Sequence, residues 1–165
     1  MVQRLAAAGF LEVRVMAVRM ELARILIKEL QDYQLIELRE VAESVGEDGK
    51  PAFSQVEGGR SFPIVIGLPE AQAIERRLKG IQIKRPQTHD LLANSIIALG
   101  GRLESITIND LSDHTFYAQL NVRDAGGKMI NIDSRPSDAI ALGIGGNVPI
   151  LVEEHVLDSA RNDEN

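Results

Sequence analysis

Charged and hydroxyl side chains gather in one short stretch, residues 132–142 (Ile-Asp-Ser-Arg-Pro-Ser-Asp-Ala-Ile-Ala-Leu). It contains the carboxylates Asp133 and Asp138, the guanidinium of Arg135 and two serine hydroxyls. Alternating apolar residues before it predict a half-buried strand, and Pro136 suits the first turn of a helix. A helix start has free N–H groups that favour anions, and an arginine can hold a phosphate through two parallel hydrogen bonds. The stretch therefore indicates an anion-binding site at a strand–helix junction.

Ordinary helix capping is the alternative interpretation of the same residues. Asp and Ser at a helix start are common capping residues, and one cap contributes about 1 kcal/mol of stability. Asp138 would also gain roughly 0.3–1 kcal/mol from the helix dipole. From spacing alone, capping is the favoured interpretation, but it does not explain Asp133 and Arg135.

A second group of candidates lies at the start of a helix predicted from residue 88 to Gly100-Gly101. We expect Thr88 to be its N-cap, with Asp90 in the first turn. The dipole at this end favours a neutral imidazole at His89, which can accept a proton or bind a metal. A purely structural histidine is the alternative, and the sequence leaves both interpretations open.

The charge balance argues mildly against a nucleic-acid partner. The net charge is −6 and the pI is about 5.1, whereas nucleic-acid-binding surfaces are usually basic. Acidic groups can nevertheless hold divalent metals that then contact phosphates. Positive charge is also concentrated locally, in Arg76, Arg77, Lys79, Lys84 and Arg85. Because basic residues also complement a helix C-terminus, this cluster has a structural and a phosphate-binding interpretation.

Length and composition indicate one compact domain. The chain has 165 residues, and we expect an N-terminal extension at 1–9, a domain at 10–159 and a disordered tail at 160–165. The absence of cysteine excludes disulfides, thiolate metal sites and a cysteine nucleophile. No stretch approaches the roughly 20 apolar residues that span a bilayer. We therefore expect a cytoplasmic protein without a membrane partner.

Hydrophobic patterns predict the elements that must position the candidate residues. We expect strands at 10–20 and 34–41, a hairpin of 53–57 with 61–66, a helix from Pro69 to Gly80, strands at 103–111 and 115–123, and a buried helix from Pro136. Residues 21–30 fit either a helix or a strand. Keeping apolar side chains on one face pairs Leu120 with Ile132 and Gln119 with Asp133.

Four blocks of the sequence together resemble the bifunctional nuclease domain family. They are residues 62–67 (Phe-Pro-Ile-Val-Ile-Gly), 85–92 (Arg-Pro-Gln-Thr-His-Asp-Leu-Leu), 108–111 with 115–118 (Ile-Asn-Asp-Leu and Thr-Phe-Tyr-Ala), and 132–142. Their order and approximate spacing also match, and the best-matched part is 58–159. The resemblance implies an α+β fold around a mixed, mostly antiparallel sheet. From the hydrophobic patterns we expect three to four helices to pack against this sheet. It also implies cleavage of both DNA and RNA.

Phosphodiester cleavage needs a nucleophile, usually water, and stabilisation of charge on the phosphoryl oxygens. Mg²⁺ or Mn²⁺ held by carboxylates can supply both, and we infer metal ligands among Asp110, Asp133 and Asp138. His89 is the candidate general base, and Arg135 is the candidate phosphate clamp. The full catalytic set that we infer is His89, Asp90, Asp133, Arg135 and Asp138. The residues expected to contact substrate are Arg85, Thr88, Tyr117 and Ser137.

A non-catalytic module that senses an anionic ligand or binds another protein is the alternative function. Other enzyme classes have little support, because there is no phosphate-binding loop, nucleophile elbow or zinc-type histidine spacing. Under either function we expect a homo-oligomer, most simply a dimer. Such a dimer would form on an exposed strand edge, for which residues 34–41 are a candidate.

Overall fold

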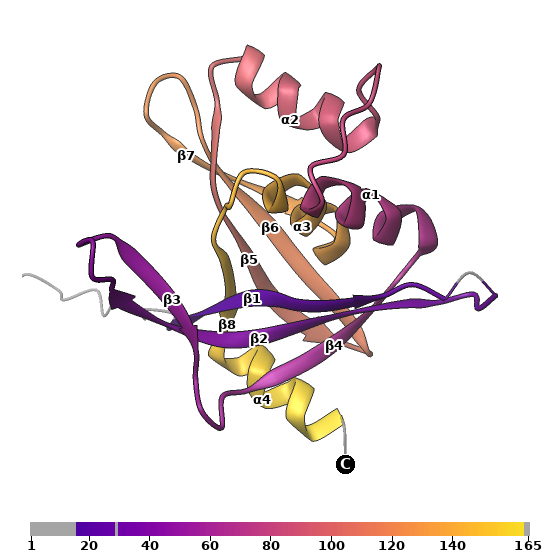
Figure 1. The fold of residues 1–165 in the computed structure, drawn as a ribbon, viewed down its shortest axis with the longest axis vertical. Helices are drawn as coiled ribbons and strands as arrows, with labels where there is room; N and C mark the ends of the chain where they lie inside the picture. Colours follow the sequence, from indigo (N-terminus) through magenta and orange to yellow (C-terminus); the bar gives the residue numbers. More distant parts are fainter. Residues whose placement is uncertain (1–15, 29, 164–165) are drawn as a thin grey trace, which may run out of the picture.

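The computed structural model describes residues 16–28 and 30–163, and within them the fold is α+β, as predicted. Eight strands form one mixed, mostly antiparallel sheet in the order β3-β2-β1-β8-β5-β6-β7, with β4 also pairing β2 (Figure 1). Four helices complete it. The elements are β1 (Ala17–Leu26), β2 (Gln34–Val45), β3 (Pro51–Gln55), β4 (Ser61–Ile66), α1 (Leu68–Leu78), α2 (Thr88–Ala98), β5 (Arg102–Ser112), β6 (Thr115–Arg123), β7 (Met129–Ser134), α3 (Pro136–Ile144), β8 (Ile150–Glu153) and α4 (Glu154–Asp163).

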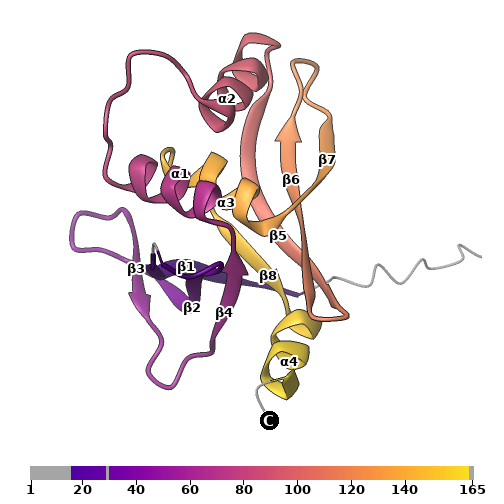
Figure 2. The same cartoon turned by 90° about the vertical axis from the view of Figure 1, so that its right-hand side faces the viewer.

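Helix α3 is the buried centre of the upper part of the molecule. Seven of its residues are buried, because its sequence is apolar nearly all round. It packs against β5 and β6 on one side and against α1 and α2 on the other, so the three helices gather beside β5–β7 (Figure 2). Burying one Ile or Leu side chain contributes roughly 1.5–3 kcal/mol. The position of the α3 start is therefore fixed by the core.

The register of β6 and β7 is the one predicted from the sequence. Leu120 pairs with Ile132, and Gln119 pairs with Asp133. Ala118 and Leu120 are buried in the core with α3, so the alternation of a strand places Gln119 and Asp133 on the opposite face. The turn between β5 and β6 has positive φ at Asp113 and His114, as a tight two-residue hairpin turn requires.

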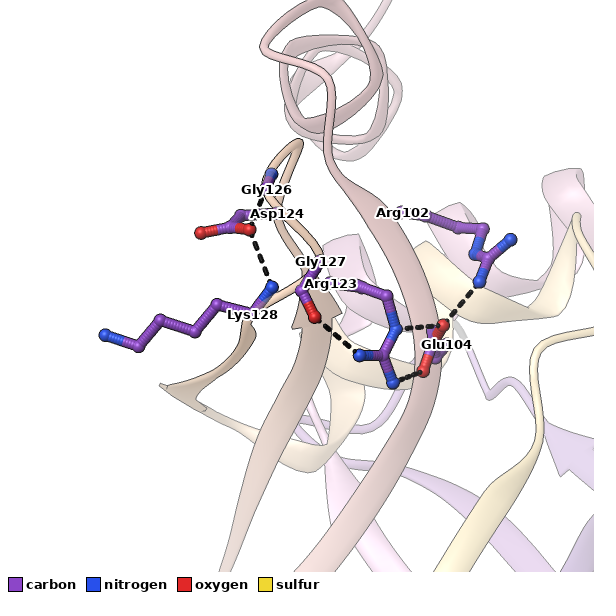
Figure 3. A network of polar contacts seen from close by, with 7 residues as sticks. All are labelled: Arg102, Glu104, Arg123, Asp124, Gly126, Gly127 and Lys128. Carbon is purple, nitrogen blue, oxygen red and sulfur yellow. Dashed lines mark hydrogen bonds and ion pairs between the residues drawn. The ribbon is translucent and has the colours of Figure 1, made fainter.

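Charged side chains brace the outer surface of β5 and β6 and the turn that follows. Glu104 accepts from Arg123 through both carboxylate oxygens, at 2.7 and 2.8 Å, and from Arg102 at 2.5 Å (Figure 3). Arg123 also donates to the Gly127 carbonyl, while Asp124 accepts from the amides of residues 126 and 128. These contacts hold the β6–β7 turn against β5.

The first half of the chain differs from the prediction in two respects. The strand predicted at 10–20 is β1 (Ala17–Leu26), and residues 10–15 lie outside the described part, as does the predicted extension at 1–9. The ambiguous segment 21–30 is a strand as far as Leu26, because it pairs with β2 on one side. Strands β3 and β4 do not form the predicted hairpin; each pairs with β2 instead.

The C-terminal end was also predicted incorrectly. Strand β8 and helix α4 were not expected, and the segment predicted as a disordered tail from residue 160 begins inside α4, which continues to Asp163. Val156, Leu157 and Ala160 are buried in the core. Their spacing is that of a helical stripe, which the polar residues around it conceal.

The structure corrects two further expectations, the N-cap of α2 and the exposed strand edge at residues 34–41. Gln87, not Thr88, is the N-cap of α2, and no residue of α2 is fully buried. Strand β2 is not an edge, since it pairs with β1, β3 and β4. Among the described strands, β7 pairs only with β6 and ends the main strand order. Among the described helices, none is long and apolar enough to cross a membrane.

Candidate functional site

The first turns of three helices bring a histidine, an arginine and two carboxylates together. Nε2 of His89, from the first turn of α2, lies 2.8 Å from Oδ1 of Asp138, from the first turn of α3. Arg135 is the N-cap residue of α3, and its Nε donates to Oδ2 of Asp138 at 2.7 Å. Its Nη2 donates to Oε1 of Glu70, in the first turn of α1, at 2.8 Å. We call His89, Asp138, Arg135 and Glu70 the polar chain.

Electrostatics fix the protonation of this polar chain. Burial raises the pKa of Asp138, but the hydrogen bonds and charge of Arg135 and His89 outweigh it, so the pKa lies below its usual value. Asp138 is therefore an ionised acceptor at neutral pH. The hydrogen bonds that Arg135 donates to Asp138 and then to Glu70 raise the pKa of Arg135. Because Asp138 only accepts, Nε2 of His89 carries the proton in this pair.

Local sequence explains how these side chains are held. Arg135 has extended backbone and Pro136 follows at the first helical position, so the chain turns sharply from β7 into α3. The buried body of α3 then holds Asp138. At the start of α1, a Cβ on residue 67 would collide with the Glu70 carboxylate. Gly67 therefore lets Glu70 fold back over the helix start toward Arg135.

A hollow of about 380 Å³ opens beside Arg135. Its walls combine apolar residues of β4 and β6 with the start of α3, and the lining includes Gly67, Phe116, Arg135 and Ser137. The Arg135 side chain remains 66% exposed, so its guanidinium can still meet a ligand in the hollow. Ser137, an expected substrate contact, is itself buried but borders this hollow.

Asp90, expected to be catalytic, is placed in a structural brace. Its two carboxylate oxygens accept from Arg76 at 2.6 Å and Arg77 at 2.5 Å. It also accepts from the Gln87 amide, which closes the capping box of α2. Burial raises the pKa of Asp90. The hydrogen bond from the Gln87 amide and the hydrogen bond and charges of the two arginines lower it by more, so the pKa lies below its usual value. Asp90 thus fixes the first turn that carries His89.

The three predicted metal ligands do not converge. Asp133 lies on the face of β7 opposite α3, whereas both oxygens of Asp138 are engaged by His89 and Arg135. Asp110 lies on β5, where its nearest charged neighbour is His155 at 3.8 Å. Within the described residues, no group of three or more His, Asp or Glu side chains is close enough to hold a metal ion. The donor set therefore does not fit a carboxylate cage.

The remaining residues expected to contact substrate form no hydrogen bond with the polar chain. Arg85 and Thr88 are exposed, and their side chains make no hydrogen bond or ion pair with other described residues. Tyr117 is exposed on β6 and pairs in register with Asp110. Sequence reasoning missed Glu70 as a member of the site. Glu70 follows Pro69 in the first turn of α1, where an acidic residue is explained by helix capping. Nothing in the sequence placed it beside Arg135.

Fold and site together define an α+β domain with a histidine–carboxylate pair beside an exposed arginine. Comparison with known families matches residues 53–165, more than half of the chain, to the bifunctional nuclease domain. The chain therefore belongs to the bifunctional nuclease domain family, as its sequence blocks indicated. The matched region includes all four residues of the polar chain and all strands from β4 onward.

Relatives of two kinds are similar to this chain. Uncharacterized proteins from two strains of Mycobacterium tuberculosis are 43% identical over 106 residues, which is 64% of this chain and 62% of theirs. Bifunctional nuclease 2 and Bifunctional nuclease 1 of Arabidopsis thaliana are 23% and 22% identical over 100 residues. That similarity covers 59% of this chain but only 30% and 31% of the plant proteins. The chain thus spans less than two thirds of the length of these relatives.

Proposed function

We propose that this protein is a nuclease that hydrolyses phosphodiester bonds in both DNA and RNA, with His89 as the general base. The observation that carries the proposal is the bond between His89 Nε2 and Asp138 Oδ1, in a chain that continues through Arg135 to Glu70. Membership of the bifunctional nuclease domain family supports this reaction class. The names of the plant relatives support a nuclease in particular.

His89 has the arrangement that a general base requires. The ionised Asp138 accepts the hydrogen bond of Nε2–H, so Nδ1 is the nitrogen of the neutral imidazole that can accept a proton. Nδ1 makes no hydrogen bond with another described residue. In the proposed step, a water oxygen bonds to phosphorus, the bond to the leaving sugar oxygen breaks, and the water proton passes to Nδ1. A positioned base of this kind contributes about 10²–10⁴-fold to a rate.

Arg135 supplies oriented hydrogen-bond donors for a phosphodiester oxygen. Its guanidinium is held at Nε by Asp138 and at one Nη by Glu70, so its orientation is fixed before substrate arrives. The exposed part of the group borders the hollow lined by Gly67 and Phe116. A phosphoryl oxygen placed there would meet a donor that needs no reorganisation, which is how electrostatic catalysis lowers a barrier.

Water is the nucleophile that suits a broad substrate range. RNA can be cleaved by attack of its own 2′-hydroxyl, but DNA has no such group. An enzyme that uses one site for both must therefore activate water. We assign this role to His89, whose Nε2 lies 2.8 Å from Oδ1 of Asp138 at the start of α2.

Metal assistance remains a prediction from the sequence. The proposed hydrolysis is written with water and protein side chains alone. Mg²⁺ is often held by only one or two carboxylates together with substrate phosphates and water. Since Asp110, Asp133 and Asp138 do not form a cage, a required cation would have to be bound largely by the substrate. The expected dimer and the expected cytoplasmic location also remain predictions.

The decisive experiment is cleavage of single-stranded DNA and of RNA by highly purified protein, beside His89→Ala purified identically. Each protein is assayed with Mg²⁺, with Mn²⁺ and with EDTA. We expect the wild-type protein to cleave both substrates and the variant to lose both activities together. Equal cleavage by the two proteins would reveal a contaminant or another site. No cleavage in any condition would favour the non-catalytic module.

A further inference from the structure

Two arginines of α1 share a single carboxylate, that of Asp90 in the first turn of α2. Nη2 of Arg76 and Nη1 of Arg77 bind opposite oxygens of Asp90, at 2.6 and 2.5 Å. All three side chains are largely buried, with 14–16% of each exposed. The group therefore carries one excess positive charge in a partly desolvated position, where a charge acts more strongly than at the surface.

This charge borders a second hollow, of about 260 Å³, that is separate from the one beside Arg135. It is lined by Arg76, Arg77, Asp90, Gly145 and the backbone segment 80–83. Asp90 is the one acidic residue in that lining. The amides of residues 82 and 83 in the segment bond to no other described residue, so they are further donors beside the two guanidinium groups.

The positive charge of Arg76 is less fully compensated by neighbouring groups than that of Arg77. Arg77 also donates from Nη2 to the Leu142 carbonyl, at 3.1 Å, near the C-terminus of α3. The negative end of that helix dipole offsets part of its charge. Within the described residues the buried Nε atoms of both arginines lack a partner, and Asp90 is the only group that compensates the charge of Arg76. Its charge is therefore available to an anion.

Additional positive charge lies along the same segment. Lys84 and Arg85 are exposed and form no ion pair with a described residue, whereas Lys79 is neutralised by Glu75 at 2.6 Å. In a chain of net charge −6, this concentration of cations leads from the hollow toward the start of α2. His89, which precedes Asp90, stands at that start.

We propose that the Arg76–Arg77–Asp90 hollow is a phosphoryl-binding subsite that holds a backbone phosphate of the nucleic acid away from the bond being cleaved. This rests on the proposed function for the identity of its occupant. Asp90 connects the subsite to His89 through the first turn of α2. A phosphate held at Arg76 therefore sets the path of the strand past the His89–Asp138 pair. Asp90 limits the affinity by cancelling one of the two positive charges.

The test measures binding separately from cleavage. A labelled single-stranded oligodeoxynucleotide is titrated into His89→Ala protein, and fluorescence anisotropy is followed over a series of salt concentrations. The same titration is repeated with Arg76→Gln and with Asp90→Asn, each in the His89→Ala background. Arg102→Gln is the matched control, because it removes the same charge from an exposed arginine on β5 that lies outside both hollows. Melting curves establish that each variant is folded.

The two variants should change affinity in opposite directions. Arg76→Gln should weaken binding at least fivefold and reduce the salt slope by about 0.7–1, the value for one lost contact to a single-strand phosphate. Asp90→Asn should tighten binding, because it removes the competing anion. If Arg76→Gln does not fold, Asp90→Asn alone decides: tighter binding supports the subsite, and unchanged or weaker binding overturns it.

Other outcomes separate this inference from the proposed function. Folded Arg76→Gln protein that binds like the Arg102→Gln control would overturn the subsite, whatever the cleavage assay shows. Binding of inorganic phosphate that is lost in Arg76→Gln, with oligonucleotide affinity unchanged, would also overturn a nucleic-acid occupant. Loss of oligonucleotide binding in Arg76→Gln, together with no cleavage by the wild-type protein, would keep the subsite and reject the nuclease.

Discussion

The Nε2 atom of His89 lies 2.8 Å from the Oδ1 atom of Asp138, although the two residues are 49 positions apart and belong to different helices. Neither side chain has an obvious role alone, because each occupies the first turn of a helix where capping is an ordinary function. Together they form an oriented imidazole beside an ionised carboxylate. This relationship between α2 and α3 is what the proposed hydrolysis depends on.

Replacing His89 should remove the general base. We expect His89→Ala to lower the turnover number at least a hundredfold on DNA and on RNA, within the range that a positioned base contributes. Exogenous imidazole should restore part of the activity, because it can occupy the vacated space. His155→Ala is the control, since His155 is exposed on α4. Imidazole that fails to rescue, in a variant with unchanged melting temperature, would argue against a proton-transfer role.

A paired comparison of Asp138→Asn with Asp133→Asn separates the two carboxylates of the β7–α3 junction. Both substitutions keep size and remove one charge. The amide at 138 can donate as well as accept, so it no longer holds the proton on Nε2 of His89, and we expect at least a tenfold loss of turnover. Asp133 lies on the other sheet face, away from α3, and its substitution should have little effect. A large loss at Asp133 alone would return that residue to the site.

Much of the sheet could be predicted because its signal is local. The alternation along β6, followed by a glycine-rich turn, predicts both the partner strand and the register, and the structure pairs Leu120 with Ile132 as expected. Strand β8 gave no such signal. It is a short strand that lies between β1 and β5, where it is parallel to β5, and pairing of strands far apart in sequence leaves no mark on either one.

The site could be predicted only in part for a similar reason. His89, Arg135 and Asp138 were all candidates, because their residue types suit the chemistry and their motifs resemble a known family. Their convergence depends on how α1 and α2 pack against α3, which no single segment encodes. The same packing brings Glu70 into the site and places Asp90 between Arg76 and Arg77 instead. Chemical type identified the candidates, and tertiary packing selected among them.

The Glu104 network gives a pH-dependent contribution to stability. Hydrogen bonds from Arg123 and then Arg102 lower the pKa of Glu104 from 4.5 to about 2. A carboxyl whose pKa is lower in the folded state stabilises the fold above the unfolded pKa, and that stabilisation is lost as pH falls through the folded pKa. The contribution should therefore be complete above about pH 4.5 and disappear between there and about pH 2.

Arg123→Gln tests this assignment. We expect the Glu104 carboxyl to titrate closer to 4.5 in the variant, as measured by NMR chemical shifts against pH. The melting temperature should differ most between the two proteins near neutral pH and converge in acid. Glu43, a carboxylate on β2 outside this network, is the internal reference in the same spectra. An unchanged titration of Glu104 would show that Arg102 alone maintains the shift.

The exposed edge of β7 gives the expected dimer a specific location. Within the described part of the chain this strand pairs only with β6, and Ile130 and Ile132 remain 40% and 42% exposed on it. An unpaired edge with apolar side chains favours addition of another strand. Antiparallel pairing of two copies about Asn131 would place Ile130 of each copy opposite Ile132 of the other. One sheet would then continue across a twofold axis.

Ile132→Lys should therefore convert a dimer into a monomer, because two buried lysines would face apolar neighbours across the axis. The mass in solution, measured by light scattering after size-exclusion chromatography, distinguishes the two states. Val45→Lys is the matched control, since Val45 is an exposed apolar residue on β2. A wild-type protein that stays monomeric at high concentration would contradict the dimer itself. A dimer that survives Ile132→Lys would place the interface elsewhere on the molecule.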